Sequence, residues 1–145
     1  MVPVTLFKSG NQYGALPSDE LDAPMLLVGV GTGMAPLWGV LRQALARGHR
    51  GPITILEAAP TPRDLYLHAP LRELAAEHGL QVRCSVLREG EGEFEQREVD
   101  GLALACLRES GLPAKSFLAY VCGDATIVQR IRKGLFMAGV SSRRI

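Results

Sequence analysis

Four segments of the chain carry the hydrophobic pattern of strands buried inside a parallel sheet. Residues 23–30 (APMLLVGV) and 51–58 (GPITILEA) are short apolar runs bounded by Gly and Pro. Such runs are typical of strands that are covered on both faces. Apolar and polar positions alternate in residues 80–87 (LQVRCSVL), and residues 115–123 (KSFLAYVCG) form another apolar run. These segments predict four strands, and residues 140–145 (VSSRRI) are interpreted as the start of a fifth, at the sheet edge.

Segments with a helical pattern lie between these strands. In residues 37–48 the apolar positions fall on one helix face, namely Leu37, Val40, Leu41, Ala44 and Leu45. Residues 67–79, 99–110 and 124–139 have similar patterns. Residues 88–98 (REGEGEFEQRE) are polar and acidic, which predicts a surface loop. Strands that alternate with helices predict right-handed crossovers and a doubly wound α/β sheet.

The loop that follows the first predicted strand is rich in glycine and reads GVGTGMAP at residues 29–36. It lacks the Lys and Ser or Thr of a nucleoside-triphosphate loop, and the G-x-G-x-x-G pattern of a dinucleotide loop fails at Met34. The loop can still bind an anion, because Gly31 and Gly33 have no side chain and let a ligand come close to the backbone. Pro36 suits the first turn of a helix, whose positive end attracts anions. A glycine-rich turn that binds nothing is the alternative interpretation.

A second strand end carries a similar signal. Residues 120–124 (YVCGD) lead from the fourth predicted strand through Gly123 into a helix. In open parallel sheets, ligands bind beyond the carboxyl ends of strands, where the strand order reverses. Two such strand ends are expected to lie next to each other there, although spacing alone does not prove that they are neighbours.

Three stretches together resemble the nicotinamide-nucleotide-binding domain of the ferredoxin reductase superfamily, a group of flavin enzymes. They are GTGMAP at residues 31–36, DLYL at residues 64–67, and residues 120–145, which begin with YVCGD. The likeness extends from about Pro24 to Ile145. It implies a Rossmann-like, five-stranded parallel sheet in the order 3-2-1-4-5 with helices on both faces. The loops after the first and fourth strands would then lie side by side.

The resemblance implies roles for residues at both loops. Gly31, Thr32 and Gly33 would hold the pyrophosphate of the nucleotide, with the Thr32 hydroxyl donating a hydrogen bond. Cys122 and Gly123 would border the nicotinamide near the flavin. The full set of implied cofactor-binding residues is Gly31, Thr32, Gly33, Met34, Pro36, Glu57, Arg63, Cys122, Gly123 and Asp124.

Cys122 is the implied catalytic position, in the sense that it lines the nicotinamide site. Two other interpretations are a covalent nucleophile and a buried cysteine that packs. The nucleophile fits poorly, because hydride transfer needs positioning rather than covalent attack and no histidine neighbours Cys122 in the sequence.

The choice between NADH and NADPH depends on the end of the second predicted strand. The Glu57 carboxylate could accept hydrogen bonds from the adenosine ribose there, and it would repel a 2′-phosphate. NADP-selective members often carry Arg or Ser just after this strand, where Pro60 stands here. This favours NADH. Arg63 leaves NADPH as the alternative, because a guanidinium can fold over a 2′-phosphate, although a surface arginine that binds no ligand explains Arg63 equally well. Asp64 is interpreted as a helix cap.

Composition narrows the classes of function. A formal net charge of +1 in 145 residues offers no basic surface of the kind that nucleic-acid binding needs. The longest apolar stretch, near residues 25–30, is too short to span a membrane, and no secretory signal is present. The three cysteines lack the spacing of a metal or disulfide framework, so a reducing cytoplasm is expected. The three histidines and Trp38 are interpreted as structural.

The resemblance implies that the chain is the NADH-presenting part of a flavin-dependent NAD(P)H oxidoreductase. Nicotinamide C4 would pass hydride to N5 of FAD or FMN, and electrons would continue to an iron–sulfur or haem acceptor. The family's flavin-binding motif R-x-[YF]-[ST] is absent, so the flavin is expected on another domain and the chain alone is expected to be inactive. Residues 1–22 are interpreted as the end of a preceding flavin-binding barrel or a linker, and residues 23–145 as the NAD(P)-binding domain. The alternative is a non-catalytic, nucleotide-binding regulatory module or a subunit that docks on a separate flavoprotein.

Overall fold

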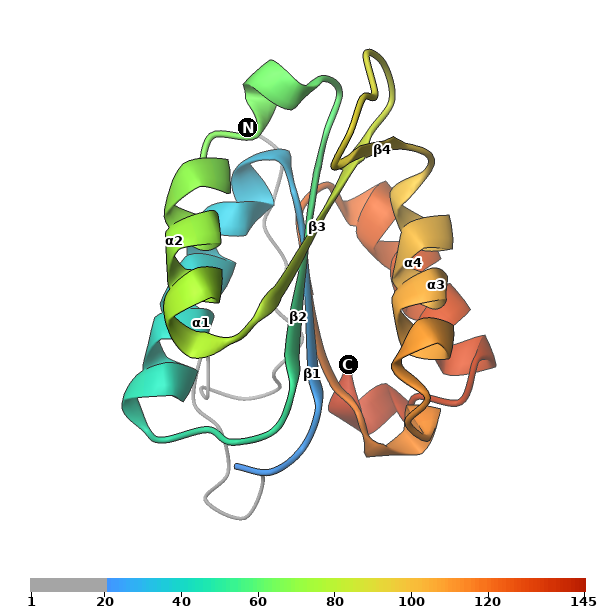
Figure 1. Cartoon of the computed structure of the whole chain (residues 1–145). Helices are drawn as coiled ribbons and strands as arrows, with labels where there is room; N and C mark the ends of the chain where they lie inside the picture. The colour runs from blue at the N-terminus through green and yellow to red at the C-terminus, as the bar shows by residue number, and fades with distance from the viewer. Residues whose placement is uncertain (1–20) are drawn as a thin grey trace.

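The structure is a computed structural model and describes residues 21–145. Figure 1 shows a central sheet with helices on both faces. The expectation that residues 1–22 belong to a flavin-binding barrel or linker falls outside the described residues, apart from Leu21 and Asp22.

The described residues form one sheet of five parallel strands. The strands are β1 (Met25–Val30), β2 (Ile53–Ala59), β3 (Gln81–Val86), β4 (Phe94–Gln96) and β5 (Leu118–Cys122). Their order is β4-β3-β2-β1-β5, and every neighbouring pair is parallel.

Helices cover both faces of this sheet. The α-helices of the described part are α1 (Met34–Ala46), α2 (His68–His78), α3 (Val99–Ser110) and α4 (Ala125–Met137). In Figure 1, α1 and α2 lie on one face and α3 and α4 on the other. None of the helices in residues 21–145 is long and apolar enough to cross a membrane.

Two apolar layers, one on each face of the sheet, explain the continuous hydrophobic runs. Successive side chains of a strand point to opposite faces. Met25 and Leu27 of β1 therefore pack towards α1 and α2, while Leu26 and Val28 pack towards α3 and α4. All four are fully buried. Because burial of each such side chain contributes about 1.5–3 kcal/mol, a central strand of this sheet is stabilised from both faces.

The predicted doubly wound, five-stranded parallel sheet is confirmed. The predicted order 3-2-1-4 of the four main strands corresponds to β3-β2-β1-β5. The edge strand comes from a different segment than expected. Residues 94–96 lie within the stretch 88–98 that was predicted as a loop, yet they pair with β3 as β4.

Polar side chains hold β4 against β3. The Arg83 guanidinium of β3 donates two hydrogen bonds of 2.9 Å to the Glu95 carboxylate and a third, also of 2.9 Å, to Glu109 of α3. The Ser85 hydroxyl donates to the Arg97 carbonyl at 2.6 Å. A polar strand of 3 residues is too short to show a hydrophobic period, so the sequence pattern could not predict it.

Residues 140–145, interpreted as the start of an edge strand, form a turn instead. Ser142–Arg144 is a 3-10 helix. Val140 and Ile145 are buried in the layer of α3 and α4. The Arg144 guanidinium donates to two main-chain carbonyls just before β5. These contacts hold the turn at the amino end of β5 and leave no extended backbone to pair.

The strand order reverses between β1 and β5. From β1 the chain adds β2 and β3 on one side, and β5 later pairs with the other side of β1. Gly29 of β1 is in register with Cys122 of β5. The loops that follow these two strands therefore leave the sheet side by side, as the resemblance implied.

Close backbone contact between these two loops requires glycine at two positions. A Cβ on Gly33 would overlap the carbonyl of Cys122 and lie 2.7 Å from the Gly123 nitrogen. A Cβ on Gly123 would lie 2.8 Å from the Cβ of Val30, and Gly123 has a φ of +150°. No residue larger than glycine fits at either position unless the neighbouring loop moves.

The helices that start at these loops are capped differently. The Asp124 carboxylate accepts a hydrogen bond of 3.0 Å from the Thr126 amide and so caps α4. α1 begins after Gly33, and no side chain of the described residues caps it. The Met34 amide donates to the carbonyls of Gly31 and Thr32, and the positive end of α1 is otherwise left to water or a ligand.

Replacing Gly33 with alanine should destabilise the fold. The new Cβ would meet main-chain atoms of the neighbouring loop, which cannot move without disturbing the pairing of β1 with β5. We expect the free energy of unfolding to fall by about 1–3 kcal/mol, the usual cost of overpacking. Urea unfolding followed by circular dichroism measures this loss.

Gly39→Ala is the matched control for this substitution. Gly39 is exposed inside α1 with open space around it. Alanine there should raise the free energy of unfolding by up to about 1 kcal/mol, because it is the better helix former. A Gly33→Ala chain as stable as the parent would contradict the close fit of the loops.

Asp124→Ala should lower the free energy of unfolding by about 1 kcal/mol, because α4 loses its cap. Asp124→Ser keeps an acceptor at the same position and should restore most of that loss. The same urea titration compares the two chains, and equal stabilities would show that the cap contributes nothing.

Candidate functional site

The loop after β1 is the first of the two predicted nucleotide-binding elements. Gly31–Gly33 forms a 3-10 turn, in which Gly31 has a φ of +59° and Gly33 a φ of −64°. Gly31 is therefore needed for its left-handed backbone, whereas Gly33 is needed for close packing. Thr32 between them is exposed, so its side chain is open to a ligand at the N-terminus of α1.

Met34 and Pro36, the two other predicted residues of this loop, belong to the first turn of α1. Met34 is 3% exposed, and its sulfur covers Gly29, where any Cβ would collide with it. Pro36 is half-buried in the first turn of α1, as expected. Met34 thus contributes packing beneath the loop. The surface that an anion can reach is made by Gly31, Thr32 and main-chain amides.

Cys122 and Gly123 meet this loop from β5, but both are buried. Cys122 is 0% exposed and lies in the layer of α1 and α2, together with Leu118 and Tyr120. Asp124 uses its carboxylate to cap α4. These contacts give the three residues packing and capping roles, and their predicted roles at a nicotinamide stay predictions.

A cavity of about 160 Å³ opens beside Gly31. It lies beyond the carboxyl ends of β1, β2 and β3, and the first turns of α3 and α4 close its other side. Its wall is mostly apolar and includes the Glu98–Arg130 ion pair, with a separation of 3.3 Å. An apolar wall with a few polar groups suits a ring of the size of a nucleobase.

Glu57 is not presented at the surface where the ribose contact was expected. It lies within β2 and is 2% exposed. Its Oε1 lies 3.1 Å from the His68 Nδ1 and accepts a hydrogen bond of 3.7 Å from the Cys84 thiol. Burial raises the pKa of Glu57, and the neighbouring His68 partly offsets this rise. The position gives Glu57 an internal role and does not support a contact with ribose.

The segment after β2 is held by its own polar contacts. Asp64 accepts hydrogen bonds from the Thr61 amide and hydroxyl, as the third residue of a capping box at the 3-10 turn Pro62–Asp64. The N-cap of that turn is Thr61 and the N-cap of α2 is Leu67, so Asp64 supports the turn and does not cap α2. The Arg63 side chain is 83% exposed and forms an ion pair of 3.6 Å with Glu89. Because an exposed ion pair contributes only about 0–1 kcal/mol, Arg63 can turn to another anion.

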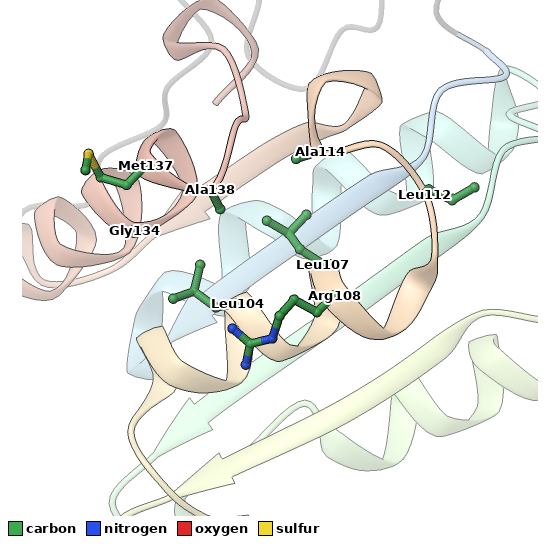
Figure 2. A pocket seen from close by; sticks show the side chains of 8 residues that line it. All are labelled: Leu104, Leu107, Arg108, Leu112, Ala114, Gly134, Met137 and Ala138. Atoms are coloured by element: carbon green, nitrogen blue, oxygen red, sulfur yellow. The ribbon is translucent and has the colours of Figure 1, made fainter.

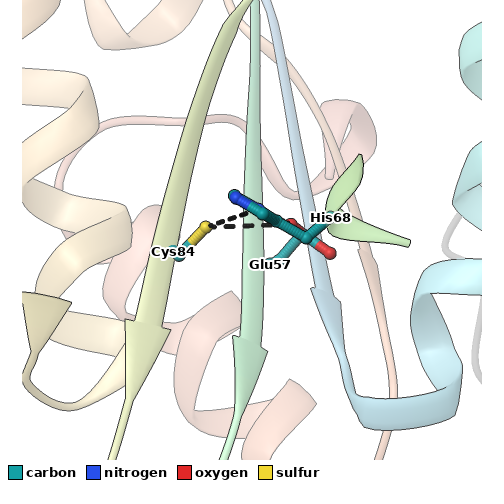
Figure 3. A group of neighbouring side chains, drawn as sticks. All are labelled: Glu57, His68 and Cys84. Carbon is teal, nitrogen blue, oxygen red and sulfur yellow. Dashed lines mark hydrogen bonds and ion pairs between the residues drawn. The ribbon is translucent and has the colours of Figure 1, made fainter. Parts of the chain in front are cut away.

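The sequence did not predict the polar cluster that contains His68. This residue was interpreted as structural, but it lies at the start of α2 in contact with Glu57 and Cys84 (Figure 3). Burial raises the pKa of Cys84 to about 12. The three side chains come from β2, α2 and β3, so no local motif marks the cluster. The one signal in the sequence was a carboxylate inside an apolar run.

A second cavity, of about 540 Å³, lies between α3 and α4. Figure 2 shows Leu104 and Leu107 of α3 pointing towards α4, which carries Gly134 and Met137. These residues belong to the carboxyl halves of the two helices, so the cavity lies towards the amino edge of the sheet. The two predicted nucleotide loops lie at the opposite edge, and this cavity is therefore separate from them.

Comparison with known proteins supports the resemblance. Residues 27–133 match the family described as the oxidoreductase NAD-binding domain. The ferredoxin–NAD(P)(+) reductase component of the naphthalene 1,2-dioxygenase system of Pseudomonas putida is 32% identical over 122 residues, or 84% of this chain and 37% of that protein. The reductase subunit of an aromatic O-demethylase from Amycolatopsis is 31% identical over 130 residues, or 89% of this chain and 38% of that protein.

Solved structures show the same relationship. An Amycolatopsis cytochrome P450 reductase matches with a TM-score of 0.77 and 29% identity, over 90% of this chain and 38% of that one. A ferredoxin NADP+ reductase from Neisseria gonorrhoeae shares the fold, with a TM-score of 0.70 and 18% identity over 85% of this chain and 52% of that one. The chain spans less than half the length of the curated relatives that it matches. Because the family match runs from β1 into α4, the chain belongs to the oxidoreductase NAD-binding domain family and is related to the ferredoxin reductases.

Proposed function

We propose that the chain binds NADH across the carboxyl edge of the sheet, where β1 and β5 meet. The pyrophosphate lies at the Gly31–Gly33 turn, at the positive end of α1, and accepts hydrogen bonds from main-chain amides of the turn and from the Thr32 hydroxyl. The adenosine lies towards β2 and β3, at the cavity beside Gly31. The nicotinamide lies towards the end of β5.

The open N-terminus of α1 is the observation that carries this proposal. α4, which starts beside it, has its own cap in Asp124, whereas α1 has none among the described residues. Uncapped amides at a helix N-terminus carry partial positive charge and favour a phosphate. Because main-chain contacts through Gly33 and Gly123 hold the two loops together, the anion meets a site that is already formed.

The contribution of the chain to catalysis is orientation of the nucleotide. When bound, the nicotinamide supplies a hydride to the flavin, FAD or FMN, of an adjoining domain. The Gly31–Gly33 turn and the start of α1 anchor the pyrophosphate, and this anchor limits the positions that the nicotinamide can take at β5. Cys122 is fully buried and Asp124 caps α4, so we assign neither residue a role in proton transfer.

The partners of the chain are proposed from its relatives. The Pseudomonas putida relative is a ferredoxin–NAD(P)(+) reductase component, and the Amycolatopsis neighbour is a cytochrome P450 reductase. We therefore expect a flavin-binding domain to adjoin this one, and an iron–sulfur or haem protein to receive the electrons. Alone, the chain should bind the nucleotide without sustained turnover.

Because Glu57 is buried, we expect Arg63 to decide between NADH and NADPH. A carboxylate that is 2% exposed does not meet a 2′-phosphate at the surface. Arg63 already pairs with Glu89, which reduces the positive charge available to a 2′-phosphate. Because Arg63 can leave this weak pair for another anion, the pairing lowers the affinity for NADPH by at most about 1 kcal/mol, which supports a several-fold preference for NADH.

Calorimetric titration with NADH, up to millimolar concentrations, tests the pyrophosphate site. Thr32→Ala should weaken binding by roughly 10–150-fold, because a hydrogen bond to a charged group contributes about 1.5–3 kcal/mol. Ser116→Ala removes a hydroxyl at the amino end of β5, the opposite edge of the sheet, and should leave the affinity unchanged. Equal affinities of the two variants would place the nucleotide elsewhere.

Titration with NADPH tests the choice of nucleotide, and the parent chain should bind it more weakly than NADH. Glu89→Gln frees the Arg63 guanidinium and should strengthen NADPH binding several-fold, while the NADH affinity stays the same. Glu77→Gln, on the exposed surface of α2, controls for the loss of one negative charge. If the parent chain binds NADPH more tightly than NADH, the assignment of NADH is wrong. That result would not contradict the pyrophosphate site at the Gly31–Gly33 turn.

A further inference from the structure

Three side chains of the types that bind metal ions converge between the sheet and α2. They are Glu57 of β2, Cys84 of β3 and His68 at the start of α2 (Figure 3). The His68 Nδ1 lies 3.1 Å from the Glu57 Oε1 and 3.4 Å from the Cys84 Sγ. The third side of this triangle, from Sγ to Oε1, is 3.7 Å. One carboxylate, one imidazole and one sulfur therefore face a common centre.

These separations match those of ligands around a single tetrahedral ion. Zn²⁺ binds sulfur at about 2.3 Å and nitrogen or oxygen at about 2.0–2.1 Å, so that neighbouring ligand atoms lie about 3.3–3.6 Å apart. Each of the three distances is within about 0.2 Å of that range. We propose that Glu57, His68 and Cys84 bind one Zn²⁺, with a water molecule as the fourth ligand.

The surroundings of His68 support its role as a ligand. The His68 Nε2 lies 3.5 Å from the Glu93 Oε1, and the Arg72 guanidinium in turn binds Glu93. In the tautomer with the proton on Nε2, directed at Glu93, the lone pair of Nδ1 would be directed at Glu57 and Cys84. Histidine ligands of metals almost always donate their second ring N–H to a partner such as a carboxylate. Glu93 and Arg72 thus favour the tautomer that the ion needs.

A divalent ion also balances the charge in this buried place. Glu57 is 2% exposed and Cys84 is 0% exposed. A carboxylate, a thiolate, a neutral imidazole and Zn²⁺ sum to zero charge, and a low-dielectric interior tolerates that sum better than an unpaired charge. Zinc accepts this mixture of sulfur, nitrogen and oxygen ligands, whereas Mg²⁺ and Ca²⁺ prefer oxygen alone.

The site has a path of entry and a structural role. The His68 side chain is 20% exposed, which gives the ion and its water access from the start of α2. Glu57 and Cys84 are in register on neighbouring strands, so the ion would join β2, β3 and α2. None of its ligands belongs to the Gly31–Gly33 turn. The zinc site therefore stands independently of nucleotide binding.

Titration of the metal-free chain with Co²⁺ tests the site, because tetrahedral Co²⁺ bound to a thiolate has strong and distinctive absorption. We expect saturation at about one ion per chain and displacement of Co²⁺ by Zn²⁺. Cys84→Ala should abolish the sulfur charge-transfer band. Cys106→Ala is the matched control, because Cys106 is also a buried free cysteine but lies in the layer of α3 and α4. Its spectrum should equal that of the parent.

Glu93→Gln tests the site without removing a ligand or opening a cavity in the core. Loss of the Glu93 charge should weaken Co²⁺ binding by about 10–100-fold, as for other partners of metal-bound histidines. Glu73→Gln, on the exposed surface of α2, the helix that carries His68, should leave the affinity unchanged. Zn²⁺ should also raise the Tm of the parent chain and not that of His68→Gln.

The absence of a saturable Co²⁺ spectrum from the parent chain would overturn the proposal. So would a spectrum that Cys84→Ala and His68→Gln leave intact, or one that Cys106→Ala loses to the same extent. In each case the three side chains form only a hydrogen-bonded cluster.

Discussion

Main-chain contact between the loop after β1 and the loop after β5 is the constraint on which the rest of this molecule depends. Gly33 packs against the Cys122 carbonyl, and Gly123 packs against Val30. The contact is possible because β1 and β5 are parallel neighbours, with Gly29 in register with Cys122. It sets two helix N-termini side by side at one edge of the sheet. An elongated anion can lie across that edge.

The two helix starts at this edge have different tasks. At the end of β5, Asp124 satisfies the amides of its own helix, and Cys122 is part of the core. At the end of β1, the helix amides have no side-chain partner among the described residues. A folded chain keeps open donors where water or a ligand can take the place of a cap. We therefore propose α1 as the anchor of the pyrophosphate and the β5 loop as the surface along which the rest of the nucleotide lies.

Glu57 shows how packing changes the role of a residue. In the sequence it is a carboxylate near the end of an apolar run, where a ribose contact is expected. In the structure the alternation of side chains along β2 directs it to the face of α2, where it meets His68 and Cys84. A polar group in such a layer needs partners, and these three supply one another. For the choice between NADH and NADPH, we therefore propose the exposed Arg63 as the deciding residue in place of Glu57.

The sequence by itself determined the α/β class, the four main strands, the helices between them and both glycine loops, because each depends on local periodicity or on neighbouring residues. It did not determine the edge strand β4, which depends on hydrogen bonds from Arg83 to a carboxylate 12 residues away. Nor did it determine the Glu57 cluster, whose members lie 11 and 27 residues from Glu57 along the chain. Such contacts depend on the register between strands and on how a helix crosses them. Both are properties of the assembled sheet, and no single segment contains them.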